Sequence, residues 1–461
     1  MENKSKRKAV ERIYALLDER SFVEIGQAVT ARSTDFQLDK VETPSDGVVT
    51  GYGLINGCPV YVYSQDAQVL GGSIGEMHAR KIVNLYDLAI KTGVPVIGMI
   101  DCAGIRLQES TDALHAFGMI YKKQAEASGV ILQISAIFGN CGGGLSVFPT
   151  LTDFTLMEEN GQLFVNAPNA IEGNRKEVLN SASAVFQSKE AGTVDFVGNE
   201  TEVFEEIRKL TQIFPSNYKD QSKVIDCVDD LNRLCENISA GNGKEILIQI
   251  ADQNEFVELK KDYGNDMAIG FIRLNGETIG CIANKEERIS AQGAKKVASF
   301  VKLCDAFGIG ILTVTDTVGF VAEIEQEKEL SQAIGTMTGA FVQATVPKVN
   351  VISKKAFGSA YVSMNSKSIG ADFVYAWSDA KIGMMEADMA VKIMNPGANA
   401  DVLKEKAKEY EELQSDVYTA ARRGYVDTVI DPAETRKYVI GAFEILYTKR
   451  EMQIPKKHSV F

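Results

Sequence analysis

Two glycine-rich turns contain the residues whose types and spacing best fit a chemical role. Gly142, Gly143 and Gly144 follow the apolar stretch Val130–Phe138, and Gly358-Ser359-Ala360 follows a second apolar stretch. Residues this small let a ligand approach the main chain closely. A helix that begins there offers N–H groups without acceptors, which can stabilise an oxyanion without any titrating side chain. The turns therefore predict two oxyanion sites, although tight strand–helix packing explains either turn taken alone.

Other catalytic patterns are weak in this sequence. The three histidines form no His-Glu-x-x-His pair, so no metal site is expected. Gly71 and Gly72 begin the segment Gly-Gly-Ser-Ile-Gly75, whose spacing differs from the Gly-x-Gly-x-x-Gly of dinucleotide-binding loops. The chemistry is therefore expected to depend on main-chain groups.

A long internal repeat indicates how these turns are positioned. Five motifs recur in the same order after 215 to 234 residues, which is typical of a duplicated domain and too long a period for a solenoid. The paired segments are 18–24 with 252–258, 51–57 with 270–276, 94–104 with 309–319, 138–144 with 356–360, and 152–154 with 371–373. Each copy should thus supply one glycine-rich turn.

The same alternation of elements occurs in both copies. Apolar strands such as Val94–Ile100 alternate with amphipathic helices such as Glu76–Thr92 and Ala294–Phe307, which predicts α/β units with parallel strands. The polar, acidic stretch Asn199–Lys244 resembles a helical connector. We therefore expect two domains, residues 1–238 and 239–461. Charged and amphipathic helices are expected over 401–414 and 438–450.

Composition excludes several classes of protein. The 461 residues are 45% hydrophobic and 24% charged, which argues against a disordered or fibrous chain. The net charge of −13 argues against nucleic-acid binding. Seven cysteines, an odd number without close spacing, argue against a disulfide framework or a zinc ribbon. Met1–Lys8 is not followed by an apolar stretch, so no signal peptide is expected. Glycines and Pro149 interrupt the uncharged segment 128–152, which argues against a membrane-spanning helix. A cytoplasmic protein is therefore expected.

Six long segments carry a recognisable family pattern. They are Asp46–Gly57, Val60–Ile82, Gly93–Asp101, Ala127–Gly144, Ala344–Met364 and Arg422–Arg436. Together they resemble the carboxyltransferase subunits of biotin-dependent acyl-CoA carboxylases and decarboxylases, such as the propionyl-CoA carboxylase beta subunit and the methylmalonyl-CoA decarboxylase alpha subunit. The resemblance extends over nearly the whole chain, from about Ala9 to Lys449.

The resemblance implies a fold and a reaction. The fold is two tandem crotonase-like (ClpP/crotonase) spiral domains, in agreement with the internal repeat. The reaction moves a carboxyl group between carboxybiotin on a carrier protein and the alpha carbon of a short-chain acyl-CoA. One oxyanion forms on the thioester and another on the ureido oxygen of biotin, so two oxyanion sites are needed.

The resemblance also implies the site residues and the partners. The residues are Gly143 and Gly144 for the thioester oxygen, Gly358, Ser359 and Ala360 for the biotin oxygen, and Gly71, Gly72 and Gly142 for the acyl-CoA. No covalent cofactor is expected, because Ala390–Met394, with Lys392, lacks the small β-domain of a biotin carrier. A separate biotin carrier protein, a biotin carboxylase or membrane decarboxylase subunit, and a homo-oligomer (a dimer or a hexamer) are the expected partners.

Departures from the family pattern leave two alternatives open. Leu330–Gly335 replaces a family stretch with a Gly-Ile-Ile-Arg motif, and Glu386–Met389 lies in the replacement of a glycine-rich one; both changes would suit a non-catalytic scaffold subunit. A crotonase-like hydratase or hydrolase acting without biotin would need an acid or base, for which Glu109 and Glu386 are the candidates. Arg106 and Glu109 are more readily explained as ion-paired support for a loop.

Overall fold

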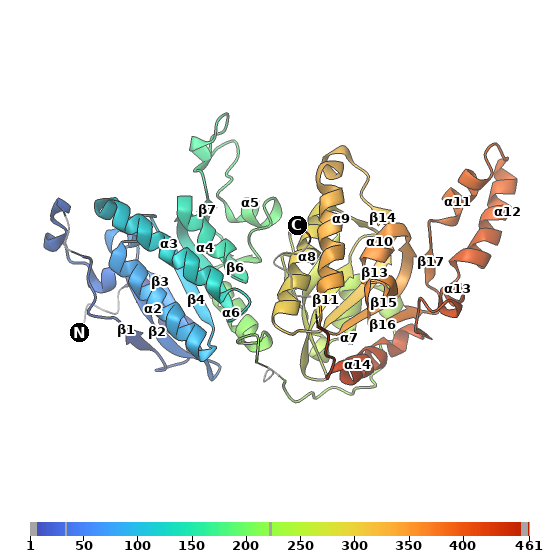
Figure 1. Ribbon diagram of the computed structural model, residues 1–461, viewed down its shortest axis with the longest axis horizontal. Helices are drawn as coiled ribbons and strands as arrows, with labels where there is room; N and C mark the ends of the chain where they lie inside the picture. The colour runs from blue at the N-terminus through green and yellow to red at the C-terminus, as the bar shows by residue number, and fades with distance from the viewer. Residues whose placement is uncertain (1–6, 33–34, 221–223, 453–459, 461) are drawn as a thin grey trace. The chain divides into compact units, whose positions relative to one another are not determined.

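The computed structural model describes residues 7–32, 35–220, 224–452 and 460 of the chain. It divides into two compact units, Met1–Lys223 and Val224–Phe461 (Figure 1). Each unit contains one large mixed β-sheet with helices packed against it.

The first unit contains an eight-stranded sheet with the order β1-β2-β3-β4-β5-β6-β8, to which β7 is added beside β5. The pairs β1–β2 and β2–β3 are antiparallel, and the pairs from β3 to β8 are parallel. The strands are β1 (Val23–Ile25), β2 (Val48–Ile55), β3 (Cys58–Gln65), β4 (Val96–Cys102), β5 (Gln133–Gly142), β6 (Phe154–Glu158), β7 (Gln162–Phe164) and β8 (Phe196–Gly198).

The sheet of the second unit repeats this arrangement. Its order is β9-β10-β11-β13-β15-β16-β18, with β17 beside β15 in the place that β7 has beside β5. The equivalent topology agrees with the duplication seen in the sequence. The strands are β9 (Val257–Leu259), β10 (Met267–Leu274), β11 (Glu277–Asn284), β13 (Ile311–Thr317), β15 (Lys348–Phe357), β16 (Phe373–Trp377), β17 (Lys381–Gly383) and β18 (Thr428–Ile430), and β12 (Arg288–Ile289) pairs separately with β14 (Gly319–Phe320).

Helices α2 and α3 lie side by side in the first unit, and α8 and α9 do so in the second (Figure 1). Their spacing of apolar residues explains their contact with the core: Ala79, Ile82, Tyr86 and Ala89 recur every three or four residues on α2 and are buried. The helices are α1 (Lys8–Leu16), α2 (Glu76–Thr92), α3 (Ser110–Ala127), α4 (Val147–Thr150), α5 (Ala184–Lys189), α6 (Glu200–Ile213), α7 (Gly243–Ile250), α8 (Ala291–Ala306), α9 (Ile324–Gln343), α10 (Gly358–Ser363), α11 (Ala387–Met394), α12 (Ala400–Tyr410), α13 (Val417–Arg422) and α14 (Thr435–Leu446).

The division between the units falls earlier than the boundary expected at residue 238. The segment after residue 223 hydrogen-bonds with the second unit: the Ile225 N–H donates to Gly276 O (3.2 Å), and the Cys235 N–H donates to Ala433 O (2.9 Å). The first half of the expected connector instead forms α6, whose apolar face is buried in the first unit. The stretch 199–244 is therefore shared between the two units.

Each unit buries one lysine at an equivalent place. Lys81 on α2 donates hydrogen bonds to the main-chain oxygens of Ser45 and Val48, beside the start of β2. Lys296 on α8 makes the matching contacts beside the start of β10, and burial lowers the pKa of both lysines to about 8. The acceptors of Lys296 are the main-chain oxygens of Lys260, Tyr263 and Met267. The repeat thus extends to buried polar contacts.

No helix within the described part of the chain is both long enough and apolar enough to cross a bilayer.

Candidate active site

The first glycine-rich turn lies at the carboxyl end of β5. Gly143 has a φ of +62°, a left-handed conformation that glycine adopts without strain. A methyl group at Gly143 would meet no described atom within 4 Å, and Gly144 is exposed. Both residues begin the 3-10 turn Gly143–Ser146, so their N–H groups have no acceptor within that turn. The turn can therefore present N–H groups to a ligand.

Gly142 has a packing role in the same turn. A Cβ atom at this position would lie 2.5 Å from Cζ of Phe164 on β7. Only glycine therefore lets β5 and β7 pair at Gly142 and Phe164 while the aromatic ring covers the strand end.

The loop with Gly71 and Gly72 lies at the same end of the sheet. Both glycines have positive φ, +67° and +66°, and the Ala103 N–H donates to Gly71 O (2.9 Å). Cys102, at the end of β4, pairs with Cys141 on β5, directly before Gly142. The five glycines predicted to meet the acyl-CoA are thus gathered where parallel strands β4 and β5 end, a common place for ligands in α/β proteins.

A buried ion network supports this loop. The Arg106 guanidinium donates through Nη1 to Asp46 Oδ1 (2.6 Å) and Glu109 Oε1 (2.8 Å), and through Nη2 to Ser73 O (2.7 Å). All three charged side chains are inaccessible to solvent. Burial raises the pKa of Asp46, and the nearby Arg106 opposes that rise. Glu109 also accepts the N–H of Glu76 (2.7 Å), so its carboxylate is committed to loop support and does not fit an acid–base role.

Asp46 is the member of this network that no sequence motif indicated. It lies 60 residues from Arg106 in the chain. The acidic residue at the start of the segment Asp46–Gly57 could have suggested a counter-ion, but only the folded chain shows that it is buried and which cation it meets.

The second turn occupies the equivalent place at the end of β15. Gly358 has a φ of +61°, and a Cβ atom there would lie 3.1 Å from Met384 O. Gly358, exposed Ser359 and buried Ala360 form the first turn of α10, so their N–H groups have no acceptor within the helix. The structure thus places one glycine-rich turn after the corresponding strand of each unit.

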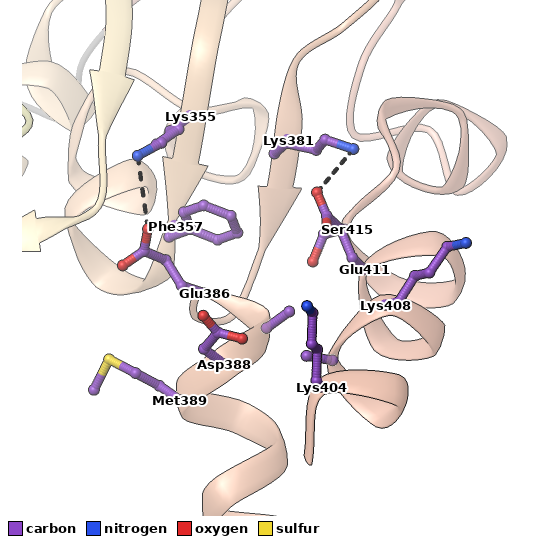
Figure 2. A pocket seen from close by; sticks show the side chains of 12 residues that line it. Lys355, Phe357, Lys381, Glu386, Asp388, Met389, Lys404, Lys408, Glu411 and Ser415 are labelled. Atoms are coloured by element: carbon purple, nitrogen blue, oxygen red, sulfur yellow. Dashed lines mark ion pairs between the residues drawn. The ribbon is translucent and has the colours of Figure 1, made fainter. Parts of the chain in front are cut away.

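A cavity of about 400 Å³ lies beside the second turn (Figure 2). It is formed by the ends of β15 and β17, by helices α11 and α12, and by the turn after α12. The lining residues are Lys355, Phe357, Lys381, Glu386, Ala387, Asp388, Met389, Lys404, Ala407, Lys408, Glu411 and Ser415. Phe357 directly precedes Gly358, so the cavity wall includes the residue before the second turn.

The charged side chains of this cavity include cations and carboxylates. Lys355 contacts Glu386 (3.6 Å), and Lys381 contacts Glu411 (3.1 Å), as the dashed lines in Figure 2 show. Met389 is 54% exposed. Glu386 and Met389 therefore line the cavity and leave it open.

Within the described ranges, no cluster of three or more histidine, cysteine, aspartate or glutamate residues has the geometry to hold a metal ion.

Comparison with known proteins identifies the family. The carboxyl transferase domain matches residues 2–461. The chain belongs to the carboxyl transferase family. It is 37% identical over 478 residues to the methylmalonyl-CoA decarboxylase alpha subunit of Propionigenium modestum, and 38% identical over 472 residues to the propionyl-CoA carboxylase beta chain of Roseobacter denitrificans. Both alignments cover 98% of this chain and 92% of the relative.

A solved structure supports the same assignment. The transcarboxylase 12S hexamer with methylmalonyl-CoA and methylmalonic acid bound is 34% identical to this chain and superimposes with a TM-score of 0.94. The match covers 98% of this chain and 92% of the 12S chain. The predicted family and the predicted fold of two tandem crotonase-like domains are confirmed.

Proposed function

We propose that this chain is the carboxyltransferase component of a biotin-dependent acyl-CoA carboxylase or decarboxylase. The observation that carries the proposal is the pair of glycine-rich turns at equivalent strand ends, β5 and β15, of a duplicated carboxyl transferase fold. A reaction with two successive oxyanions needs two sets of fixed N–H donors.

The acyl-CoA is proposed to lie along the Gly71–Gly72 loop with its thioester oxygen at the first turn. The N–H groups of Gly143 and Gly144 would bind that oxygen more strongly as it gains negative charge in the enolate. Main-chain donors suit this role because an amide proton is too weakly acidic to be transferred to the oxyanion.

The second turn is proposed to hold the biotin ureido oxygen through the N–H groups of Ser359 and Ala360. Carboxybiotin supplies the carboxyl group and, after release of carbon dioxide, the base for the alpha proton. The exposed position of Ser359 and the open cavity beside Phe357 fit the approach of a group carried on another protein.

The proposal includes the partners. Biotin would arrive on a separate carrier protein, and a biotin carboxylase or a membrane decarboxylase subunit would set the direction of transfer. A homo-oligomer is supported by the hexamer of the transcarboxylase 12S relative. A cytoplasmic location is supported by the seven cysteines, which form no disulfide bond with one another in the described residues.

Two observations favour catalysis over the alternatives. A scaffold subunit would be favoured if Glu386 or Met389 filled the cavity beside Phe357, but both residues line that cavity and leave about 400 Å³ open. A hydratase without biotin would need a free acid or base. Glu109 is buried in the Arg106 network, so its carboxylate does not fit that role, and Glu386 is in an ion pair with Lys355.

The test is carboxyl transfer by the assembled, purified protein. The protein is mixed with a biotinylated carrier protein and malonyl-CoA or methylmalonyl-CoA, and carboxylation of the carrier is followed by mass spectrometry. We expect transfer with at least one of these thioesters. Absence of transfer with every short acyl-CoA tried would overturn the proposal.

A matched pair of variants tests the second turn. Ser359→Ala keeps the main-chain N–H and should leave transfer within about twofold of the wild type. Ser359→Pro removes that N–H at a position in the first helical turn where proline is tolerated, and should lower kcat by about 10²–10³-fold. Equal activity of the two variants would exclude the Ser359 N–H from the reaction.

A further inference from the structure

Two side-chain hydroxyl groups bind the carbonyl groups of the first glycine-rich turn. The Ser146 hydroxyl donates to Gly143 O at 2.7 Å. The Tyr121 hydroxyl, which comes from α3, donates to Gly144 O. The two carbonyls that flank the Gly144 Cα atom are therefore both held.

The planarity of the peptide bond links these carbonyls to the N–H donors. In a trans peptide, the carbonyl of Gly143 and the N–H of Gly144 lie in one plane and point in opposite directions. A hydroxyl that fixes Gly143 O therefore also fixes the direction of the Gly144 N–H. The Tyr121 contact fixes the next peptide plane, so rotation on both sides of Gly144 is restricted.

Both hydroxyl groups are themselves held in place. Ser146 is buried. The Tyr121 ring packs edge-on against Phe117 and Phe148, each with 5.6 Å between ring centroids. Burial raises the pKa of Tyr121, so its hydroxyl keeps its proton at neutral pH and remains a donor.

A local turn motif does not explain this arrangement. A serine that bonds the carbonyl three residues earlier is a common motif, and Ser188 on α5 makes the same kind of contact with Val185 O (3.2 Å). Tyr121, in contrast, reaches the turn from 23 residues away in the sequence. Tyr121 from α3 and Ser146 from the turn together hold the peptide planes on both sides of Gly144, which fixes the direction of its N–H group.

We propose that Ser146 and Tyr121 are positioning residues that aim the Gly144 N–H at the thioester oxygen of the acyl-CoA. The inference rests on the proposed function of the first turn. Neither side chain is required to touch the substrate, because each acts through the peptide planes of Gly144.

The kinetic test compares Ser146→Ala and Tyr121→Phe with Ser188→Ala as the matched control. Ser188 is buried to a similar degree and bonds a carbonyl at the same spacing. Each of the first two variants should lower kcat about tenfold with KM for the acyl-CoA unchanged within twofold, and Ser146→Thr should restore most of the loss. The control should keep the wild-type kcat. Wild-type kcat in both Ser146→Ala and Tyr121→Phe would overturn the inference.

A binding test gives an answer even without turnover. Isothermal titration of the full chain compares acetyl-CoA with S-ethyl-CoA, a thioether that lacks the carbonyl oxygen. The wild type should prefer the thioester, and Tyr121→Phe, which leaves the ring packing intact, should reduce that preference severalfold. If the wild type shows no preference, or if the variant keeps it, the inference is wrong. If the wild type prefers the thioester but transfers no carboxyl group, the proposed function is wrong and this inference still stands.

Discussion

Replacement of Arg106 by methionine should destabilise the first unit strongly. The guanidinium neutralises Asp46 and Glu109, both inaccessible to solvent, at 2.6 and 2.8 Å. Arg106→Met would leave two buried carboxylates without their cation, and removal of one partner from a buried ion network costs about 3–5 kcal/mol. The loss should also free the loop at Ser73, whose carbonyl accepts a hydrogen bond from Arg106.

The single tryptophan provides an internal reference for this measurement. Trp377 is buried in the second unit, where its indole N–H donates to Thr435. In urea titrations, circular dichroism reports both units, and tryptophan fluorescence reports the second. Arg106→Met should move a circular-dichroism transition to lower urea while the fluorescence midpoint is retained. A cost below about 1 kcal/mol would refute the assignment of Arg106 as support for this unit.

The pH dependence of the same variant supplies a second check. Burial already raises the pKa of Asp46 despite the nearby cation, and loss of Arg106 should raise it further. A carboxyl with a raised folded-state pKa stabilises the fold at low pH and loses that contribution as the pH rises. The deficit of Arg106→Met should therefore shrink between pH 7 and pH 5. Addition of Asp46→Asn and Glu109→Gln should recover much of it at pH 7, and a deficit unchanged by either treatment would contradict the electrostatic cause.

Three further predictions concern separate features of the fold. Burial raises the pKa of Asp153 to about 7. The free energy of unfolding should therefore fall by about 2–4 kcal/mol as the pH rises from about 4 through 7. Asp153→Asn should remove most of this pH dependence when unfolding is measured by chemical denaturation. Gly142→Ala should cost about 1–3 kcal/mol because its Cβ would lie 2.5 Å from Phe164, and Phe164→Leu in the same chain should relieve the loss; a double variant no more stable than the single one would contradict the steric cause. Glu386→Gln should change the unfolding free energy by less than about 1 kcal/mol, because its ion pair with Lys355 is partly exposed; a larger loss in thermal unfolding would show that the cavity wall depends on this pair.

The regular elements were predictable because their patterns are local. The apolar spacing predicted a helix over 76–92, and α2 has those bounds. The helix expected over 294–307 begins earlier, as α8 from Ala291, because Ser290 caps its first turn by accepting the Gly293 N–H. The strand expected to end at Phe138 continues as β5 to Gly142, because β7 pairs with its last residues. A local pattern of residues cannot predict this pairing between β5 and β7.

The candidate site was predictable only in its main chain. Glycine at a strand end has a local signature, so both turns could be found by their composition. The groups that hold the first turn have none: Tyr121 resembles any aromatic residue of an amphipathic helix, and Ser146 resembles any polar residue of a loop. Their roles depend on which carbonyl each hydroxyl meets, and that is decided by tertiary packing.

The two buried lysines bear on how traces of a gene duplication survive. Lys81 and Lys296 both bind main-chain carbonyls, which every residue type carries. Substitutions in the surrounding loops can therefore accumulate without removing an acceptor. Each lysine keeps its hydrogen bonds even when the neighbouring side chains change. An ion pair such as Arg106 with Asp46 depends on two specific side chains and is lost when either one changes. Side chains that bind the main chain should therefore remain equivalent in the two halves of a duplicated protein for longer than ion pairs between two side chains.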